Sequence, residues 1–129
     1  MAPRHDLNGL RVQQYGDPNV YLMDQGLRRW IPNPQVMARL FTAGGVILDL
    51  HVNKMDTGRQ LPQECVMFQV TDSPQVFLLD HDVNGEQIKR WITTAEAMDR
   101  FQFDWAKIKR WNVPLASLGL PDGPDISWP

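Results

Sequence analysis

The segment "DHDVNGE" carries oxygen-bearing side chains at alternate positions, a spacing that suits a metal ion. Asp80, Asp82 and Asn84 alternate along it, and Gly85 follows directly. Calcium loops begin in this way, because alternate oxygens face the cation and glycine permits the sharp turn. An EF-hand loop closes with a bidentate Glu, but this sequence has Trp91 at that position. A calcium site here would therefore be a weak one, completed by another loop.

The same residues also form turns without a metal, since Asp, Asn and Gly are common turn formers. The sequence favours this interpretation, a polar hairpin tip, and keeps calcium at Asp80, Asp82 and Asn84 as the alternative hypothesis. No other cofactor is expected. The corresponding turn earlier in the chain is only "DQG", so folding does not require the longer loop at residues 80–86. We predict that this loop projects and that Asp82, Asn84 and Glu86 contribute to a ligand site.

Tryptophan is frequent, with five among 129 residues. Its large amphipathic ring serves either a small core or a binding face. Trp30 and Trp91 each follow an arginine in a predicted strand, where neighbouring side chains point to opposite faces. An exposed tryptophan would turn Arg29 or Arg90 inward, which is costly. We therefore predict that both tryptophans pack in the core, and keep a sugar-stacking platform as the alternative.

Two other tryptophans, Trp105 and Trp111, lie in segments free of this constraint. We predict that both are exposed and bind ligand together with the long loop.

Catalytic signatures are absent: there is no nucleophile elbow, phosphate-binding loop, zinc-protease motif or Cys-x-x-Cys pair. The single cysteine, Cys65, lies in the apolar context "CVMF" and is predicted to be a small buried residue. We do not expect an enzyme.

The chain repeats itself. The stretch "VYLMDQGLRRWI" returns as "VFLLDHDVNGEQIKRWI", and the later "MDTGRQL" returns as "LPDGPDI". Aligned pairs include Pro18 with Pro74, Val20 with Val76, Asp24 with Asp80, Trp30 with Trp91, Met37 with Met98 and Gly58 with Gly123. The repeats span residues of about 9–61 and 65–126. Two copies are too few for a solenoid, so they predict one pseudo-twofold domain with a shared core.

Each repeat is predicted to contain a strand, a hairpin, a helix and another strand. The runs "VYLM" and "VFLL" are apolar at every position, which is typical of strands covered on both faces. Asn33 with Pro34 predicts one helix start, and Thr93 with Glu96 predicts the other as a capping box. The segment at residues 112–129 is rich in proline and is predicted to be irregular. The fold class is therefore α+β and rich in β-structure.

Size and charge exclude some classes of protein. A chain of 129 residues with a net charge of −2 fits a single domain at residues 1–129, and lacks the basic surplus of a nucleic-acid binder. No apolar run approaches the length of a membrane span. The N-terminus has no hydrophobic signal region. We expect a protein that stays in the cytoplasm or leaves by a route other than Sec.

The pattern Val-Tyr-Leu-x-Asp, Gly, Arg-Arg-Trp-Ile-Pro resembles a short tandem repeat of bacterial surface and secreted proteins. Those repeats end in Phe-x-Trp, which "FDW" at residues 103–105 matches, whereas the first repeat has "FTAGG" and lacks this tryptophan. The resemblance covers nearly the whole chain. It implies an accessory or binding module and no particular catalytic residue.

These observations predict a non-catalytic module that binds a carbohydrate or another cell-surface component. The alternative is a protein–protein assembly subunit of a bacterial toxin or surface complex. The apolar strand predicted at residues 46–52 is a candidate edge for pairing into a homodimer, since twofold pairing is the commonest closed symmetry.

Overall fold

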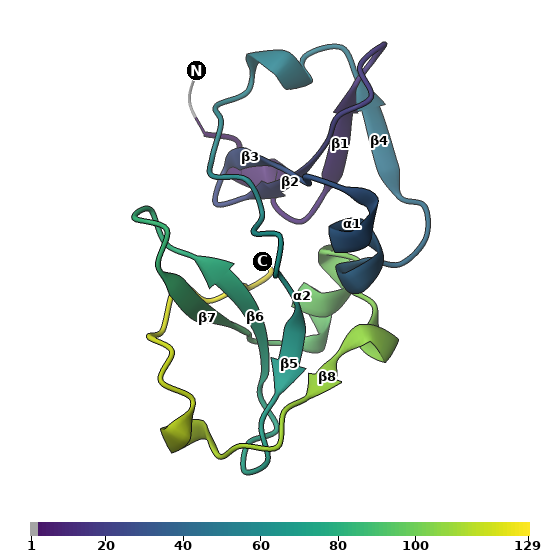
Figure 1. The fold of residues 1–129 in the computed structure, drawn as a ribbon. Helices are drawn as coiled ribbons and strands as arrows, with labels where there is room; N and C mark the ends of the chain where they lie inside the picture. Colours follow the sequence, from purple (N-terminus) through teal and green to yellow (C-terminus); the bar gives the residue numbers. More distant parts are fainter. Residues whose placement is uncertain (1–2) are drawn as a thin grey trace.

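The computed structural model describes residues 3–129 as an α+β fold rich in β-structure (Figure 1). It contains two four-stranded mixed sheets. The first, in the order β3-β2-β1-β4, comprises β1 (Arg11–Gln14), β2 (Val20–Asp24), β3 (Leu27–Trp30) and β4 (Val46–Asp49). The second, in the order β7-β6-β5-β8, comprises β5 (Met67–Gln69), β6 (Val76–His81), β7 (Gln87–Ile92) and β8 (Lys109–Arg110). The predicted fold class is confirmed.

Both sheets are built in the same way. An antiparallel meander is followed by a helix, and the chain then returns to lie parallel to the first strand. Equivalent residues pair in the same register: Arg11 lies opposite Leu22 on β1 and β2, as Met67 lies opposite Leu78 on β5 and β6. The sequence repeat is therefore also a structural repeat.

The two helices, α1 (Pro34–Leu40) and α2 (Ala95–Arg100), lie beside each other where the sheets meet (Figure 1). The Asn33 side chain accepts a hydrogen bond from Val36 N at 2.9 Å, which caps α1 as predicted. The cap of α2 is Thr94, whose side chain accepts from Ala97 N at 3.1 Å. The predicted cap at Thr93 is wrong by one residue, because Thr93 N pairs with Ile126 O and continues the strand contacts of β7.

One apolar cluster joins the two repeats. It includes Leu22 and Leu40 from the first repeat and Leu78, Met98 and Phe103 from the second. Smaller clusters fill the outer face of each sheet, and the C-terminal segment covers that of the second sheet. This segment has only a short 3-10 turn, Leu115–Ser117, and isolated bridges to β7, in keeping with its many prolines.

The edge strand β4 ends at Asp49, earlier than predicted, because the chain turns into a 3-10 helix at Val52–Lys54. Three apolar side chains of this region, Ile47, Leu48 and Leu50, are exposed. Homodimer formation through this edge remains a prediction. Within the described residues, no helix is long and apolar enough to cross a membrane.

Candidate functional site

Four charged side chains meet in the interior, two from each repeat. Arg29 donates from Nη1 and Nη2 to both carboxylate oxygens of Asp80, each at 2.7 Å. Arg90 donates in the same way to both oxygens of Asp24, at 2.6 and 3.0 Å. Each arginine also donates to the aspartate of its own repeat, at 2.9 Å for Arg29 and 3.1 Å for Arg90. The bidentate pairs therefore cross between the repeats. We call these four residues the ion-pair cluster.

The Nε–H of each guanidinium is also satisfied. Nε of Arg29 donates to the Arg59 carbonyl at 2.6 Å, and Nε of Arg90 donates to the Pro124 carbonyl at 2.9 Å. A Cβ added at Gly58 would lie closest to Leu27 Cβ, at 3.0 Å, and one added at Gly123 would clash with the Ile88 side chain; each would also lie 3.2 Å from Cγ of the neighbouring arginine. The repeated glycine is therefore explained by these close contacts.

The four side chains of the ion-pair cluster remain ionised at neutral pH. Burial alone would raise the pKa of Asp24, but contacts with Arg90 and Arg29 lower this pKa below its usual value. The pKa of Asp80 is lowered on the same balance, with Arg29 as its main partner. All four groups stay charged at neutral pH and every carboxylate oxygen is occupied. The cluster therefore stabilises the fold and offers no free acid or base.

This arrangement reverses the predicted orientation of β3 and β7. The arginines face the interior, so Trp30 and Trp91 turn outward and are 38% and 37% exposed. The prediction that these tryptophans pack in the core is wrong. The desolvation cost of an inward arginine is offset only when it meets a carboxylate in good geometry, and here the bidentate carboxylate comes from the other repeat.

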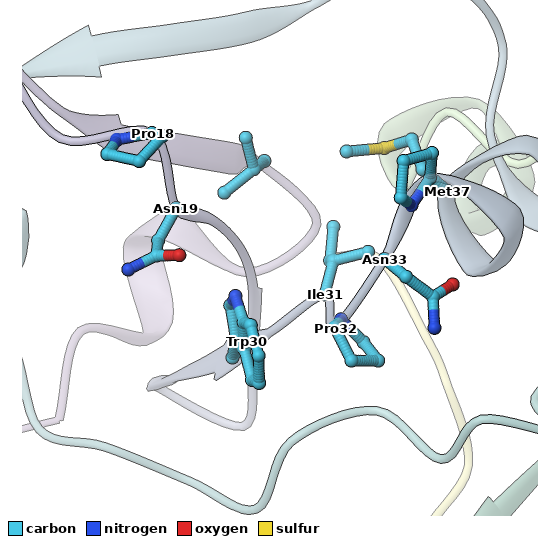
Figure 2. A pocket seen from close by; sticks show the side chains of 9 residues that line it. Pro18, Asn19, Trp30, Ile31, Pro32, Asn33 and Met37 are labelled. Carbon is cyan, nitrogen blue, oxygen red and sulfur yellow. The ribbon is translucent and has the colours of Figure 1, made fainter.

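Trp30 borders a hollow of about 340 Å³ at the end of the first sheet (Figure 2). Figure 2 shows the ring between Asn19 on one side and Pro32 on the other, with Met37 farther along on α1. The wall is mainly apolar, and the amide of Asn19 supplies a polar group. Its lining comprises Pro18, Asn19, Val20, Trp30, Ile31, Pro32, Asn33, Pro34 and Met37.

A second hollow, of about 280 Å³, lies at the equivalent place in the second repeat. Every lining residue of the first hollow has its repeat partner here: Pro74, Gln75, Val76, Trp91, Ile92, Thr93, Thr94, Ala95 and Met98. The second hollow has one addition, Trp105, which is 53% exposed. We call the two cavities the Trp30 hollow and the Trp91 hollow.

The residues predicted as ligand-binding fall in three separate places. Trp105 joins the Trp91 hollow. Trp111 instead stacks on Phe68, with ring centroids 4.0 Å apart, and helps to cover the second sheet. The polar loop residues Asp82, Asn84 and Glu86 lie at the tip of the β6–β7 hairpin.

Two of the three proposed calcium ligands are engaged with other groups in the structure. Asp80 is buried in the ion-pair cluster, and Asp82 Oδ1 accepts hydrogen bonds from Asn84 N and Glu86 N, as in an ordinary turn. Among residues 3–129, no group of three acidic, histidine or cysteine side chains could hold a metal ion. Cys65 is fully buried, and burial raises the pKa of its thiol.

Sequence reasoning missed the polar members of the two hollows, such as Asn19 and Gln75. The available signal was the repeat itself, because the turns "DPNV" and "SPQV" place an amide side chain between Pro and Val in both copies. The chain matches no protein-family model, no curated protein and no solved structure.

Proposed function

We propose that this protein is a non-catalytic binding module for saccharides, with the Trp30 and Trp91 hollows as its sites. The observation that carries the proposal is the outward position of both indole rings over equivalent hollows. Burying a tryptophan ring stabilises a fold. Here the two rings stay partly exposed while arginines occupy the interior, so the exposed ring faces are available to a ligand.

The chemistry of the hollows suits a sugar. The flat apolar face of an indole matches the C–H face of a pyranose ring, and nearby polar groups can bond its hydroxyls. The Trp30 hollow supplies the amide of Asn19, and the Trp91 hollow supplies the amide of Gln75. This role agrees with the binding module implied by the resemblance to bacterial surface repeats.

The proposal is tested by a glycan array, followed by titration of the hits with intrinsic tryptophan fluorescence. We expect Trp30→Ala and Trp91→Ala each to remove one site or to weaken it at least about tenfold, a loss of roughly 1.4 kcal/mol. Tyr15→Ala is the matched control, because Tyr15 is an exposed aromatic residue outside both hollows. Absence of any saccharide binding, or full binding by the double tryptophan variant, would refute the proposal.

The hairpin tip provides a rival location for the site, with Asp82, Asn84 and Glu86 as its contacts. In the structure Asp24 pairs with Leu27, and Asp80 pairs with Ile88. Replacing residues 81–87 by Gln-Gly therefore gives the second hairpin the turn of the first and keeps Asp80. We expect this variant to bind saccharide as wild type does. Loss of binding would move the site to the loop.

A protein–protein assembly subunit is the second candidate function. It is favoured by the exposed apolar side chains beside the open edge of β4, namely Tyr15, Ile47, Leu48 and Leu50. An unpaired strand edge can add a strand from a partner. A stoichiometric partner recovered from the native producer, and lost with Leu48→Lys, would support this function.

A further inference from the structure

Arg11 is a buried charge with no counter-ion among the described residues. Its side chain on β1 is only 2% exposed, and no carboxylate among residues 3–129 lies within ion-pair distance of it. Nη2 donates to the carbonyls of Gly44 and Thr42 and to Gln102 Oε1, all of them neutral. Burial accordingly lowers the pKa of Arg11, although an arginine stays charged at neutral pH.

The Nε and Nη1 groups of this guanidinium have weak hydrogen-bond partners or none among the described residues. Nε has no hydrogen-bond partner among the described residues. Nη1 donates to the Met37 sulfur at 3.2 Å, and a thioether is a weak acceptor. The Phe41 ring, with its centroid 4.6 Å from the guanidinium carbon, offsets only part of the charge. By contrast, Arg29 and Arg90 each meet two carboxylates.

The scaffold does not need an arginine at this position. Arg11 pairs with Leu22, and the residue that pairs with Leu78 in the second repeat is Met67, which is fully buried. A neutral side chain therefore fills the equivalent place. A charge that the fold does not require, and leaves without a counter-ion, points to a partner outside the chain.

Arg11 also lines a hollow of about 470 Å³ between α1 and the segments after each helix. Lys107 adds a second positive charge to its wall, and Asp104 adds one negative charge. The Asp104 carboxylate already accepts a hydrogen bond from Ala106 N at 2.9 Å. Met37 lines the hollow too, and its unbranched side chain can move aside from Nη1.

We propose that this hollow binds an oxyanion, a carboxylate or phosphate group, whose oxygen replaces the Met37 sulfur at Arg11 Nη1. The exchange substitutes a charge-assisted hydrogen bond for a weak one and supplies the missing counter-charge. Lys107 assists as a second cation at the wall. The site adjoins the Trp30 hollow and shares Met37 and Pro34 with its wall.

The experiment titrates the full chain with inorganic phosphate and with glucuronate, using glucose and matched sodium chloride as controls. Thermal unfolding and the Nε–H resonance of Arg11 are followed together. We expect a saturable rise in Tm of a few degrees and a shift of this resonance with one or both oxyanions. Sodium chloride should produce neither, and glucose, which can enter the saccharide sites, should leave the Arg11 resonance unmoved. A response to phosphate alone would identify a phosphate group as the ligand, and a response to glucuronate alone would identify a carboxylate.

Arg11→Met, which copies the second repeat, should abolish the rise in Tm while leaving the free protein at least as stable as wild type. Arg110→Met, on the exposed strand β8, should retain the full response. A rise with phosphate that persists in Arg11→Met, or an Arg11 resonance unmoved by both oxyanions in wild type, would overturn the proposal. If Arg11→Met fails to fold, the Arg11 resonance of the wild-type protein still tests the proposal.

Discussion

A buried guanidinium is stabilised only by what its five N–H groups meet, and this chain offers two contrasting cases. Arg29 and Arg90 meet carboxylates that leave no oxygen unused. Arg11 meets carbonyls, a sulfur atom and an aromatic ring. The first case belongs to the architecture of the fold, whereas the second leaves a charge for a ligand to neutralise.

Acid should destabilise the protein through Asp24 and Asp80. Their pKa values are lower in the folded chain than in the unfolded one, which is near 3.9. Their contribution is therefore complete above about pH 4 and is lost as the pH falls toward the folded pKa values. We expect the free energy of unfolding, measured by urea denaturation, to fall steeply below about pH 4.

Asp125→Asn serves as the control, because it alters an exposed carboxylate outside the ion-pair cluster and should leave this pH dependence unchanged. Asp24→Asn should cost about 3–5 kcal/mol at neutral pH, since it leaves buried arginines without full compensation. An unfolding free energy that stays constant from about pH 5 to about pH 3 would contradict the role given to these carboxylates.

At the scale of elements, the central strands are the part that local sequence determines best. The runs "VYLM" and "VFLL" predict strands covered on both faces, and β2 and β6 lie in the middle of their sheets. Leu22→Ala and Leu78→Ala should each cost about 2–5 kcal/mol, because both side chains are fully buried in the shared core. Chemical denaturation measures this loss, with Leu50→Ala as the exposed control. A loss below about 1 kcal/mol at both sites would mean that these strands pack loosely.

The sequence of β3 and β7 alone does not predict which of their side chains point into the core. The alternation of Arg29 with Trp30 requires one of them to face inward, and on a single strand the tryptophan is the cheaper choice. The deciding partner, Asp80, lies in the other repeat and becomes visible only when the two hairpins meet. The proposed saccharide sites depend on this facing, so sequence reasoning included Trp105 of the Trp91 hollow but placed Trp30 and Trp91 in the core.

At the scale of the whole molecule, the duplication makes each half depend on the other. The apolar cluster draws side chains from both repeats, and each bidentate ion pair joins one repeat to the other. Phe41 and Phe103 also stack across the boundary, with ring centroids 5.5 Å apart. A single repeat would expose these apolar side chains and leave its arginine with one aspartate.

The chain divided between residues 62 and 63 should therefore give two fragments that are unfolded alone and folded together. Each fragment lacks half of the shared core, and the cost of leaving Arg29 or Arg90 without its bidentate partner adds to this loss. Circular dichroism and the dispersion of amide NMR resonances would report folding of each fragment and of an equimolar mixture. Arg29→Met in the first fragment should weaken reassembly, whereas Lys54→Met, an exposed change on the 3-10 helix Val52–Lys54 outside the ion-pair cluster, should leave it intact. A cooperative unfolding transition in either fragment alone would show that one repeat is a complete folding unit, and that the crossed ion pairs join two independent halves.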